Sequence, residues 1–530
     1  MAGIANDTKG VRQDAYELEQ PAEAQAHGDV FLSTSTDTAN MLRMGKQQEM
    51  KRVFKQMSLI SFTAIIMGYY ELGGMSYIWT FFGYALLATS LADMASMCPT
   101  AEFAPPQLQQ VLSYAAGWLA ALSWQAGNAS GLFLCANIIQ SLMAIKNPSY
   151  AEPAWQGWLL VIAVTLICVV FNIWAEPILP HMQNLFMPIY VAAFIATIAV
   201  MWALCPHVDA HTALVEVTNS GGWSSNGLAL MVGQISAIFA LGGSDAAAHM
   251  SEEVRDAGLS VPRAMIASIL INAGIGFIAL ISFLFALPSI DDAINDPSGF
   301  PLVYVLNLAG RPNLTVGLMF LQLLLLMVSN VAYQASTGRQ TFAFARDGGM
   351  PFSKWIGHVN PKYHLPVNAV LLTAIITILL CIINLGSSDA FAAILSLAAV
   401  AQMATYSISI SCVLYRRVTA PHLLPKAQWG LGRWGVPVNA AGAAYAWFAF
   451  FWAFWPASTP VAADSMSKSE PLVAVSSNYA SMEEADHLAD YAIVMFGGVM
   501  ILALIYFVVQ ARKTYAGPVT RTEAYLEGKL

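Results

Sequence analysis

Hydrophobic residues along this chain form long blocks without charged residues, instead of narrow stripes at helical spacing. A helix that crosses a bilayer needs about 20 consecutive apolar residues. The pattern predicts an all-α integral membrane protein of about twelve transmembrane helices, and it excludes a β-barrel, whose strands alternate apolar and polar residues over roughly ten positions. The clearest blocks are residues 153–175, 264–290, 312–338, 363–388, 390–415, 434–463 and 491–511. Further spans are predicted within residues 103–145, 177–208 and 217–244, with two more between residues 57 and 97.

The composition supports the same class of protein. Of the 530 residues, 57% are hydrophobic and 11% are charged, which is too little charge to cover the surface of a soluble protein of this length. The six cysteines lie in or beside apolar blocks at no metal-like spacing, so we expect buried thiols. No metal-ligand cluster, nucleotide-binding loop or nucleophile–base pair is visible, which predicts a protein that is no enzyme and uses no metal or cofactor. The net charge of −8 is spread over loops and tails, and we expect no nucleic-acid partner.

The basic residues predict the orientation. With the amino terminus in the cytoplasm, all but three of the 24 lysines and arginines fall on the cytoplasmic side; the exceptions are Lys146, Arg311 and Lys468. The same distribution favours one long, tilted span within residues 103–145, because two spans there would turn the later basic loops outward.

These expectations give a simple domain plan. Residues 1–50 are predicted to be a disordered cytoplasmic tail, residues 51–511 a twelve-helix domain, and residues 512–530 a cytoplasmic carboxyl tail. The plasma membrane is the expected location, with the vacuole or another endomembrane as the alternative.

The sixth predicted span contains an unusual polar sequence. Gly242 and Gly243 are followed by Ser244 and by Asp245, an ionisable residue within an apolar segment. Two glycines weaken a helix, and a carboxylate in a membrane is costly unless it has a use. The sequence predicts a broken helix whose free peptide groups bind a substrate; a close helix crossing with a capped aspartate is the alternative. His249 lies one turn beyond Asp245 on the same face. We consider two roles for it: a proton relay, or a simple histidine at the end of the helix.

The first predicted span carries a weaker version of this pattern. Glu71 follows Gly68 at the spacing that separates Asp245 from Gly242. Broken spans at matching positions of two halves are typical of inverted-repeat transporters.

Several segments together resemble one family. Gly117-Trp118-Leu119, Ser123-Trp124-Gln125-Ala126, residues 239–253, Val261-Pro262-Arg263-Ala264 and Phe344-Ala345-Arg346-Asp347-Gly348-Gly349-Met350-Pro351 look like the fungal amino acid/choline transporter family. That family includes choline and γ-aminobutyrate (GABA) permeases and belongs to the amino acid–polyamine–organocation superfamily. The resemblance covers nearly the whole chain after residue 50.

The resemblance implies a five-plus-five inverted repeat, at about residues 57–205 and 226–415, with two extra helices at about 436–456 and 491–510. It implies a secondary carrier of a small amine or amino acid, by alternating access with proton coupling or exchange, although no lysine lies in span 5, where some proton-coupled relatives keep one. The residues that it implies for the substrate site are Ile66, Met67, Gly68, Glu71, Trp124, Phe239, Ala240, Leu241, Gly242, Asp245 and Tyr406. For coupling or gating we single out Asp245, His249, Glu253 and Arg346.

Two alternatives stay open. Residues 57–97 are barely long enough for two spans and their connection, so a shortened first hairpin with impaired transport is one hypothesis. A non-transporting nutrient sensor of the same fold is the alternative function.

Overall fold

The computed structural model describes residues 33–43, 48–67, 76–97, 104–105, 107–147, 149–150, 153–216, 219, 221–296, 298–385, 389–455 and 491–515. All elements of regular structure in these residues are helices, and two isolated β-bridges join Phe54 to Val254 and Asn360 to Leu365.

The helix count agrees with the hydrophobic pattern. Eight of the described helices are long and apolar enough to cross a membrane. Six lie in α4 (Tyr77–Met97), α5 (Gln109–Lys146), α6 (Ala154–Trp174), α11 (Ala257–Phe285), α14 (Pro312–Arg346) and α17 (Asp389–Thr419). The other two are Glu176–Leu204, which includes α7 (Leu179–Leu204), and Val494–Thr514, which begins in α19 (Tyr491–Tyr506) and continues beyond it. Three shorter apolar helices, α3 (Gln56–Met67), α9 (Asn226–Leu241) and α16 (Val367–Ile382), join them, and α18 (Gly435–Trp452) completes the predicted set of about twelve.

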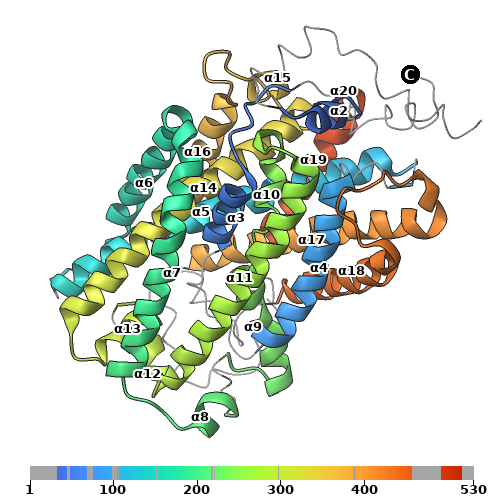
Figure 1. The fold of residues 1–530 in the computed structure, drawn as a ribbon. Helices are drawn as coiled ribbons and strands as arrows, with labels where there is room; N and C mark the ends of the chain where they lie inside the picture. The colour runs from blue at the N-terminus through green and yellow to red at the C-terminus, as the bar shows by residue number, and fades with distance from the viewer. Residues whose placement is uncertain are drawn as a thin grey trace, which may run out of the picture.

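Short helices lie at the two ends of this bundle (Figure 1). We call the face with α2 (Ser35–Arg43), α15 (Ser353–Ile356) and α20 (Arg512–Thr514) the terminal face. We call the face with α8 (Ala210–Leu214), α12 (Ile290–Ile294) and α13 (Pro301–Asn307) the far face. The remaining short elements are α10 (Ala246–His249), η3 (Glu176–Ile178), η4 (Ser251–Glu253), η5 (Ile383–Leu385), η6 (Pro421–Leu423), η7 (Gly432–Trp434) and η9 (Phe507–Ala511).

Corresponding helices of the two halves pack against each other. The second, third and fourth spans, α4, α5 and α6, contact α11, α14 and α16 respectively. A two-fold relation between two five-helix halves, as in the predicted inverted repeat, would bring these three pairs together. The two extra helices lie outside it: α18 packs on α4 and α17, and α19 packs on α17 and α5.

The third span is a single helix of 38 residues, α5, as the charge distribution predicts. It lies at the centre of the bundle, with α14 and α17 as its main neighbours. More than half of its most apolar stretch is buried inside the protein. Small residues such as Gly117, Gly127 and Gly131 allow the side chains of neighbouring helices to approach its backbone.

One part of the amino-terminal tail differs from the prediction. The sequence predicts disorder through residue 50, but residues 35–43 form α2, and Met50 is buried with Phe342 and Phe344 of α14. The prediction was wrong for this segment. Its polar composition is typical of disorder, but Asp37 forms hydrogen bonds with the start of α11, a contact that the composition of the segment does not indicate.

Candidate substrate site

The sixth span is broken where the sequence predicts. Helix α9 ends at Leu241, Gly242 is extended, and Gly243 has a φ of +100°, which L side chains rarely adopt. The N–H of Gly242 bonds to the Phe239 carbonyl at 3.1 Å, and the next backbone bond runs from Ala246 to the Gly243 carbonyl at 3.1 Å. Among the described residues, the N–H groups of Gly243, Ser244 and Asp245 therefore have no backbone acceptor. The break exposes peptide dipoles inside the bundle.

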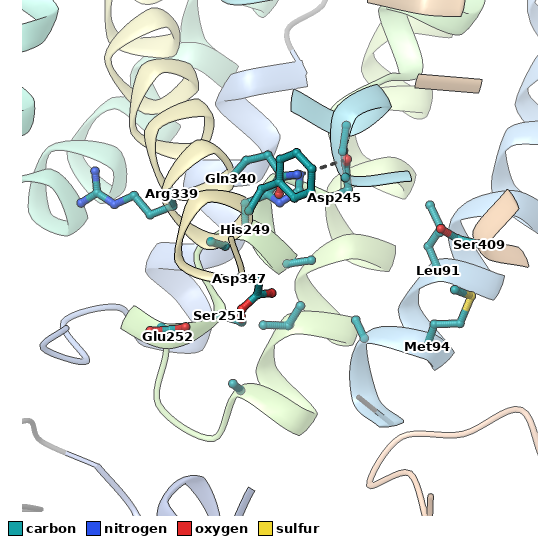
Figure 2. Close-up of a pocket in the computed structure, with 18 of the residues that line it drawn as sticks. Leu91, Met94, Asp245, His249, Ser251, Glu252, Arg339, Gln340, Asp347 and Ser409 are labelled. Carbon is teal, nitrogen blue, oxygen red and sulfur yellow. Dashed lines mark ion pairs between the residues drawn. The ribbon is translucent and has the colours of Figure 1, made fainter. Parts of the chain in front are cut away.

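Asp245 lies at this break and faces into the protein. The residue is 8% exposed, and its Oδ2 atom accepts a hydrogen bond from the indole N–H of Trp124 at 3.2 Å. The same oxygen lies 3.4 Å from Nε2 of His249, one turn further along the chain (Figure 2). The predicted proximity of the acid and the histidine is confirmed.

Half of this carboxylate has no partner. Oδ1 of Asp245 and Oγ of the adjacent Ser244 are both buried without a hydrogen bond to any described residue. Buried polar atoms in proteins are nearly always hydrogen-bonded, and an unpaired carboxylate oxygen is among the costliest exceptions. The Tyr406 hydroxyl is a protein donor that interacts with this carboxylate, and Oδ1 can still accept a hydrogen bond from a further donor.

Aromatic rings hold Trp124 in place. Its ring centroid lies 4.6 Å from that of Tyr333 and 4.9 Å from that of His249, the latter edge-on. Tyr333 fits because residue 127 is glycine: a Cβ there would lie 2.0 Å from the tyrosine oxygen. Trp124 is 2% exposed, so its N–H is fixed toward Asp245 by packing.

Two further tyrosines lie near the carboxylate. Tyr406 of α17 and Tyr84 of α4 are 4% and 0% exposed, and both interact electrostatically with Asp245. The Tyr406 hydroxyl accepts a hydrogen bond from Nε2 of Gln402 at 3.0 Å, and Oε1 of the same glutamine lies 3.2 Å from the position of a Cβ on Gly242. Gln402 thus connects the tenth span to the break in the sixth.

A cavity of about 450 Å³ extends from this cluster toward the terminal face. Its volume is within the usual range for small-molecule sites. Asp245, Ala248 and His249 line its inner end, and its walls come from α4, α5, α11, α14 and α17 (Figure 2). Among the described residues, no group of three histidines, cysteines or acids could hold a metal ion.

Two ion pairs lie beside this cavity at the terminal face. Oε1 of Glu253 accepts a hydrogen bond from Nε of Arg339 at 2.7 Å, and each side chain is 1% exposed. Oε2 of Glu252 accepts one from Arg346 at 3.2 Å, in a pair that is 17% exposed on each side. The sequence suggests Glu253 and Arg346 as gating residues; the structure gives them different partners, in two parallel pairs that join the loop after span 6 to α14.

The other predicted site residues divide into two groups. Gly68 and Glu71 lie outside the described residues, as do the connections at residues 68–75 and 98–103 that bear on the shortened hairpin. Helix α3 ends at Met67, and the Ile66 carbonyl accepts a hydrogen bond from Ser329 of α14 at 3.4 Å.

On the sixth span, Phe239 packs against a cluster formed by α5, α6, α16 and α17, and Leu241 is fully buried. The residues that line the cavity do not include Phe239, Ala240 or Leu241, so the cavity lies on the terminal side of the break. Tyr84, Tyr333 and Gln402 cannot be recognised as site residues from the sequence, because a single aromatic or amide side chain in an apolar helix does not indicate a binding site.

Comparison with known proteins agrees with this geometry. The profile of the "Amino acid permease" family matches residues 53–476. The chain is 28% identical to an amino acid/polyamine transporter named in Macrophomina phaseolina, over 74% of this chain and 89% of the relative. It is 26% identical to amino-acid permease 2 of Neurospora crassa, over 95% and 93%. It is 25% identical to a choline transporter of Saccharomyces cerevisiae, over 76% and 74%. The chain therefore belongs to the amino acid permease family and is a membrane transporter, not an enzyme.

Proposed function

We propose that this protein is a secondary active permease for a small amine or amino acid, and that Asp245 binds the substrate's ammonium group. The observation that carries the proposal is the buried and unpaired Oδ1 of Asp245 next to a broken helix. An ammonium donor would satisfy this oxygen, and free N–H groups at the break would bind a carboxylate on the same molecule.

The aromatic surroundings extend the substrate class. Trp124, Tyr333 and Tyr406 surround the acid, and an aromatic face attracts a cation by about 0.5–2 kcal/mol. GABA and ordinary amino acids carry both an ammonium donor and a carboxylate, and polyamines carry ammonium donors alone. Choline has a quaternary nitrogen without an N–H, so it would be held by its charge and by the aromatic faces. The fungal relatives named as amino-acid and choline transporters support the same set.

We further propose alternating access with proton coupling or exchange. His249 lies 3.4 Å from Asp245 at the inner end of the cavity, so a proton on this pair would compete with a substrate cation for the charge of the same carboxylate. In this proposal the terminal face is cytoplasmic and the protein lies in the plasma membrane, with the vacuole or another endomembrane as the alternative.

Uptake of a panel of labelled amines in cells expressing the parent and Asp245→Asn tests the proposal. Asparagine keeps an acceptor for Trp124 but loses the charge. Truncating one partner of a buried charged contact costs about 2–5 kcal/mol, so the substrate's Kd should rise roughly 30-fold to several thousand-fold.

The matched control is Asp209→Asn, which changes an exposed aspartate that caps α8 on the far face and should leave uptake unchanged. Equal transport of every amine by parent and Asp245→Asn would refute the assignment. Binding by the purified parent without uptake or exchange would favour the sensor alternative.

A further inference from the structure

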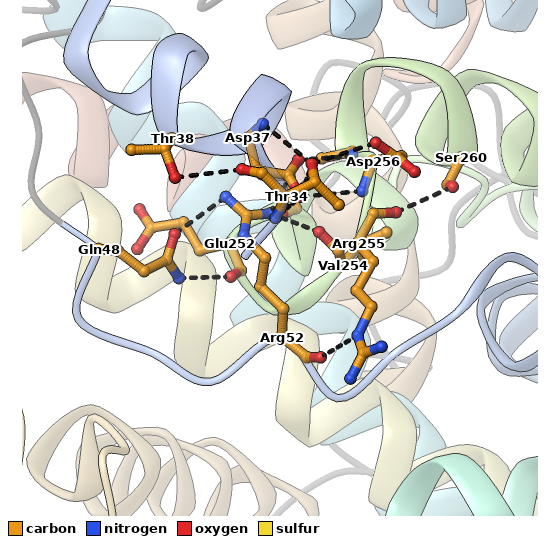
Figure 3. Close-up of polar contacts among 12 residues, drawn as sticks. Thr34, Asp37, Thr38, Gln48, Arg52, Glu252, Val254, Arg255, Asp256 and Ser260 are labelled. Atoms are coloured by element: carbon orange, nitrogen blue, oxygen red, sulfur yellow. Dashed lines mark hydrogen bonds and ion pairs between the residues drawn. The ribbon is translucent and has the colours of Figure 1, made fainter. Parts of the chain in front are cut away.

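The amino-terminal segment is anchored to the start of α11 by one side chain. Both carboxylate oxygens of Asp37, in α2, accept backbone hydrogen bonds there: Oδ2 from Asp256 at 3.0 Å and Oδ1 from Ala257 at 3.2 Å (Figure 3). A carboxylate at the first N–H groups of a helix satisfies donors that have no partner within the helix.

Helix α11 has no cap of its own. Asp256 occupies the residue before the helix, but it has a φ of +49° and its side chain makes no capping hydrogen bond. The capping acceptor is instead Asp37, 219 residues earlier in the chain. The start of the seventh span is thus completed by the amino-terminal segment.

A second stretch of the same segment, residues 48–54, holds the loop that carries the ion pairs. The N–H of Phe54 donates to the Glu253 carbonyl at 2.9 Å, and the N–H of Arg255 donates to the Phe54 carbonyl at 3.1 Å. Nη1 of Arg52 donates to the carbonyls of Ser251, at 3.1 Å, and Val254 (Figure 3).

Arg52 connects the two stretches. Its Nη1 lies 3.6 Å from Oδ1 of Asp37, and the arginine is 2% exposed. Burial lowers the pKa of Arg52, and the carboxylates of Asp37, Glu252 and Asp256 oppose this shift. A buried arginine among acids and carbonyls fixes both stretches to the same loop.

This segment also forms one wall of the cavity. Asp37, Asn40, Met41, Met50 and Arg52 line the cavity whose inner end is Asp245. The segment therefore stands between the terminal face and the proposed substrate site, and it contacts the loop after span 6 with backbone, side-chain and charge interactions.

We infer that residues 33–43 and 48–54 are an autoinhibitory closure: they cover part of the cavity at the terminal face and must detach from the start of α11 before substrate can pass. The identification of the cavity as a substrate path rests on the proposed function, but the closure can be tested without any substrate.

The test measures access to the cavity with a membrane-impermeant maleimide. The reporter is Ser409→Cys, a nearly isosteric change of a residue that lines the cavity (Figure 2), in a background without the six native cysteines. Labelling is followed in sealed vesicles of both orientations, so the result does not depend on which face is cytoplasmic.

Three changes should open the closure. Asp37→Ala removes the cap, and deletion of residues 1–43 removes α2. Thr34→Glu puts a negative charge where the threonine hydroxyl now donates to Asp37 at 2.9 Å and Asp256 at 3.2 Å. We expect each to raise the labelling rate from the terminal face at least about tenfold, since separation of like charges or loss of the cap favours the detached segment.

Asp209→Ala is the matched control, because Asp209 caps α8 on the far face by the same chemistry and should not change labelling. Equal labelling in the parent, Asp37→Ala and Thr34→Glu would overturn the inference, as would a parent already labelled as fast as the deletion. If Asp37→Ala aggregates in size-exclusion chromatography, the labelling rates of Thr34→Glu and of the deletion variant decide whether the closure exists. Labelling decides the closure and uptake by Asp245→Asn decides the proposed function, so either proposal can fail while the other stands.

Discussion

Replacing Glu253 by glutamine is the sharpest test of the ion pairs at the terminal face. The change keeps the shape of the side chain and removes the charge opposite Arg339. In the parent, Nε of Arg339 lies 2.7 Å from Oε1 of Glu253, and both side chains are 1% exposed. Both Nη atoms of Arg339 are buried without a hydrogen-bond partner among the described residues, so the guanidinium depends on this carboxylate.

The magnitude follows from this burial. Removing one partner of a buried ion pair typically costs about 3–5 kcal/mol, because the other charge remains desolvated. Glu176, 8% exposed, also interacts electrostatically with Arg339 and offsets part of the loss. We therefore expect Glu253→Gln to lower the free energy of unfolding by about 3 kcal/mol, which corresponds to a roughly hundredfold change in the unfolding equilibrium.

The neighbouring pair provides a matched control. Glu252→Gln removes the same group from Arg346, but each partner there is 17% exposed, so water reaches the remaining charge and the expected loss is smaller than for Glu253→Gln. The assay is thermal stability of the detergent-solubilised protein, measured as the fraction that stays monodisperse after heating. The Glu253→Gln variant should lose its monodisperse fraction at a clearly lower temperature than the Glu252→Gln variant.

A double-mutant cycle completes the test. Glu253→Gln combined with Arg339→Gln should be less damaging than the sum of the single changes, because neither charge is left alone. The reasoning is refuted if the two glutamine variants melt together, or if the double mutant shows simple additivity.

The remaining predictions concern the site itself. Gly127→Ala should displace Tyr333, destabilise the protein by about 1–3 kcal/mol and weaken amine binding, measured by competition with labelled substrate. Trp124→Phe removes the N–H that binds Asp245 at 3.2 Å and should raise the substrate's Kd roughly tenfold or more, since hydrogen bonds to charged groups are worth about 1.5–3 kcal/mol. Gly243→Ala forces a side chain to a φ of +100° and should lower thermal stability by about 1–3 kcal/mol.

Controls for the two glycine changes lie in the sixth span. A Cβ on Gly233 meets nothing within 4 Å, so Gly233→Ala should change neither stability nor amine binding, whereas Gly127→Ala should lower both. Gly242 has a φ of −70°, so Gly242→Ala should strain the backbone less than Gly243→Ala, and its remaining cost comes from the Gln402 oxygen that would lie 3.2 Å from the new Cβ. Equal effects within either pair would contradict the packing and backbone arguments.

Local features of the sequence were enough to predict the centre of the site. Paired glycines before a membrane-embedded acid predicted the break at Gly242 and Gly243, and a spacing of one helical turn predicted the approach of His249 to Asp245. The charge distribution predicted α5 as one span. These predictions succeeded because each depends on residues close together in the chain.

Partner choice over long separations could not be predicted. Nothing near Glu253 indicates Arg339 rather than Arg346 as its partner, because both arginines lie on one helix, two turns apart. Similarly, the polar composition around Asp37 is typical of disorder, and its order comes from α11, a distant segment. The shortened-hairpin hypothesis concerns residues 68–75 and 98–103 and stays a prediction, which sequencing of the transcript would test.

The length of α5 has a mechanical consequence. Its 38 residues extend about 57 Å, nearly twice the roughly 30 Å hydrocarbon core. Tyr114 contacts Phe507 near one end, and Ser141 donates to the Ser298 carbonyl near the other. Trp124 lies between them, about 23 Å and 33 Å from the two ends. A tilt of about 5° around Trp124 would move the ends roughly 2 and 3 Å in opposite directions. In the proposed alternating access, this helix would turn as one rigid rod about Trp124, so that widening one opening would narrow the other.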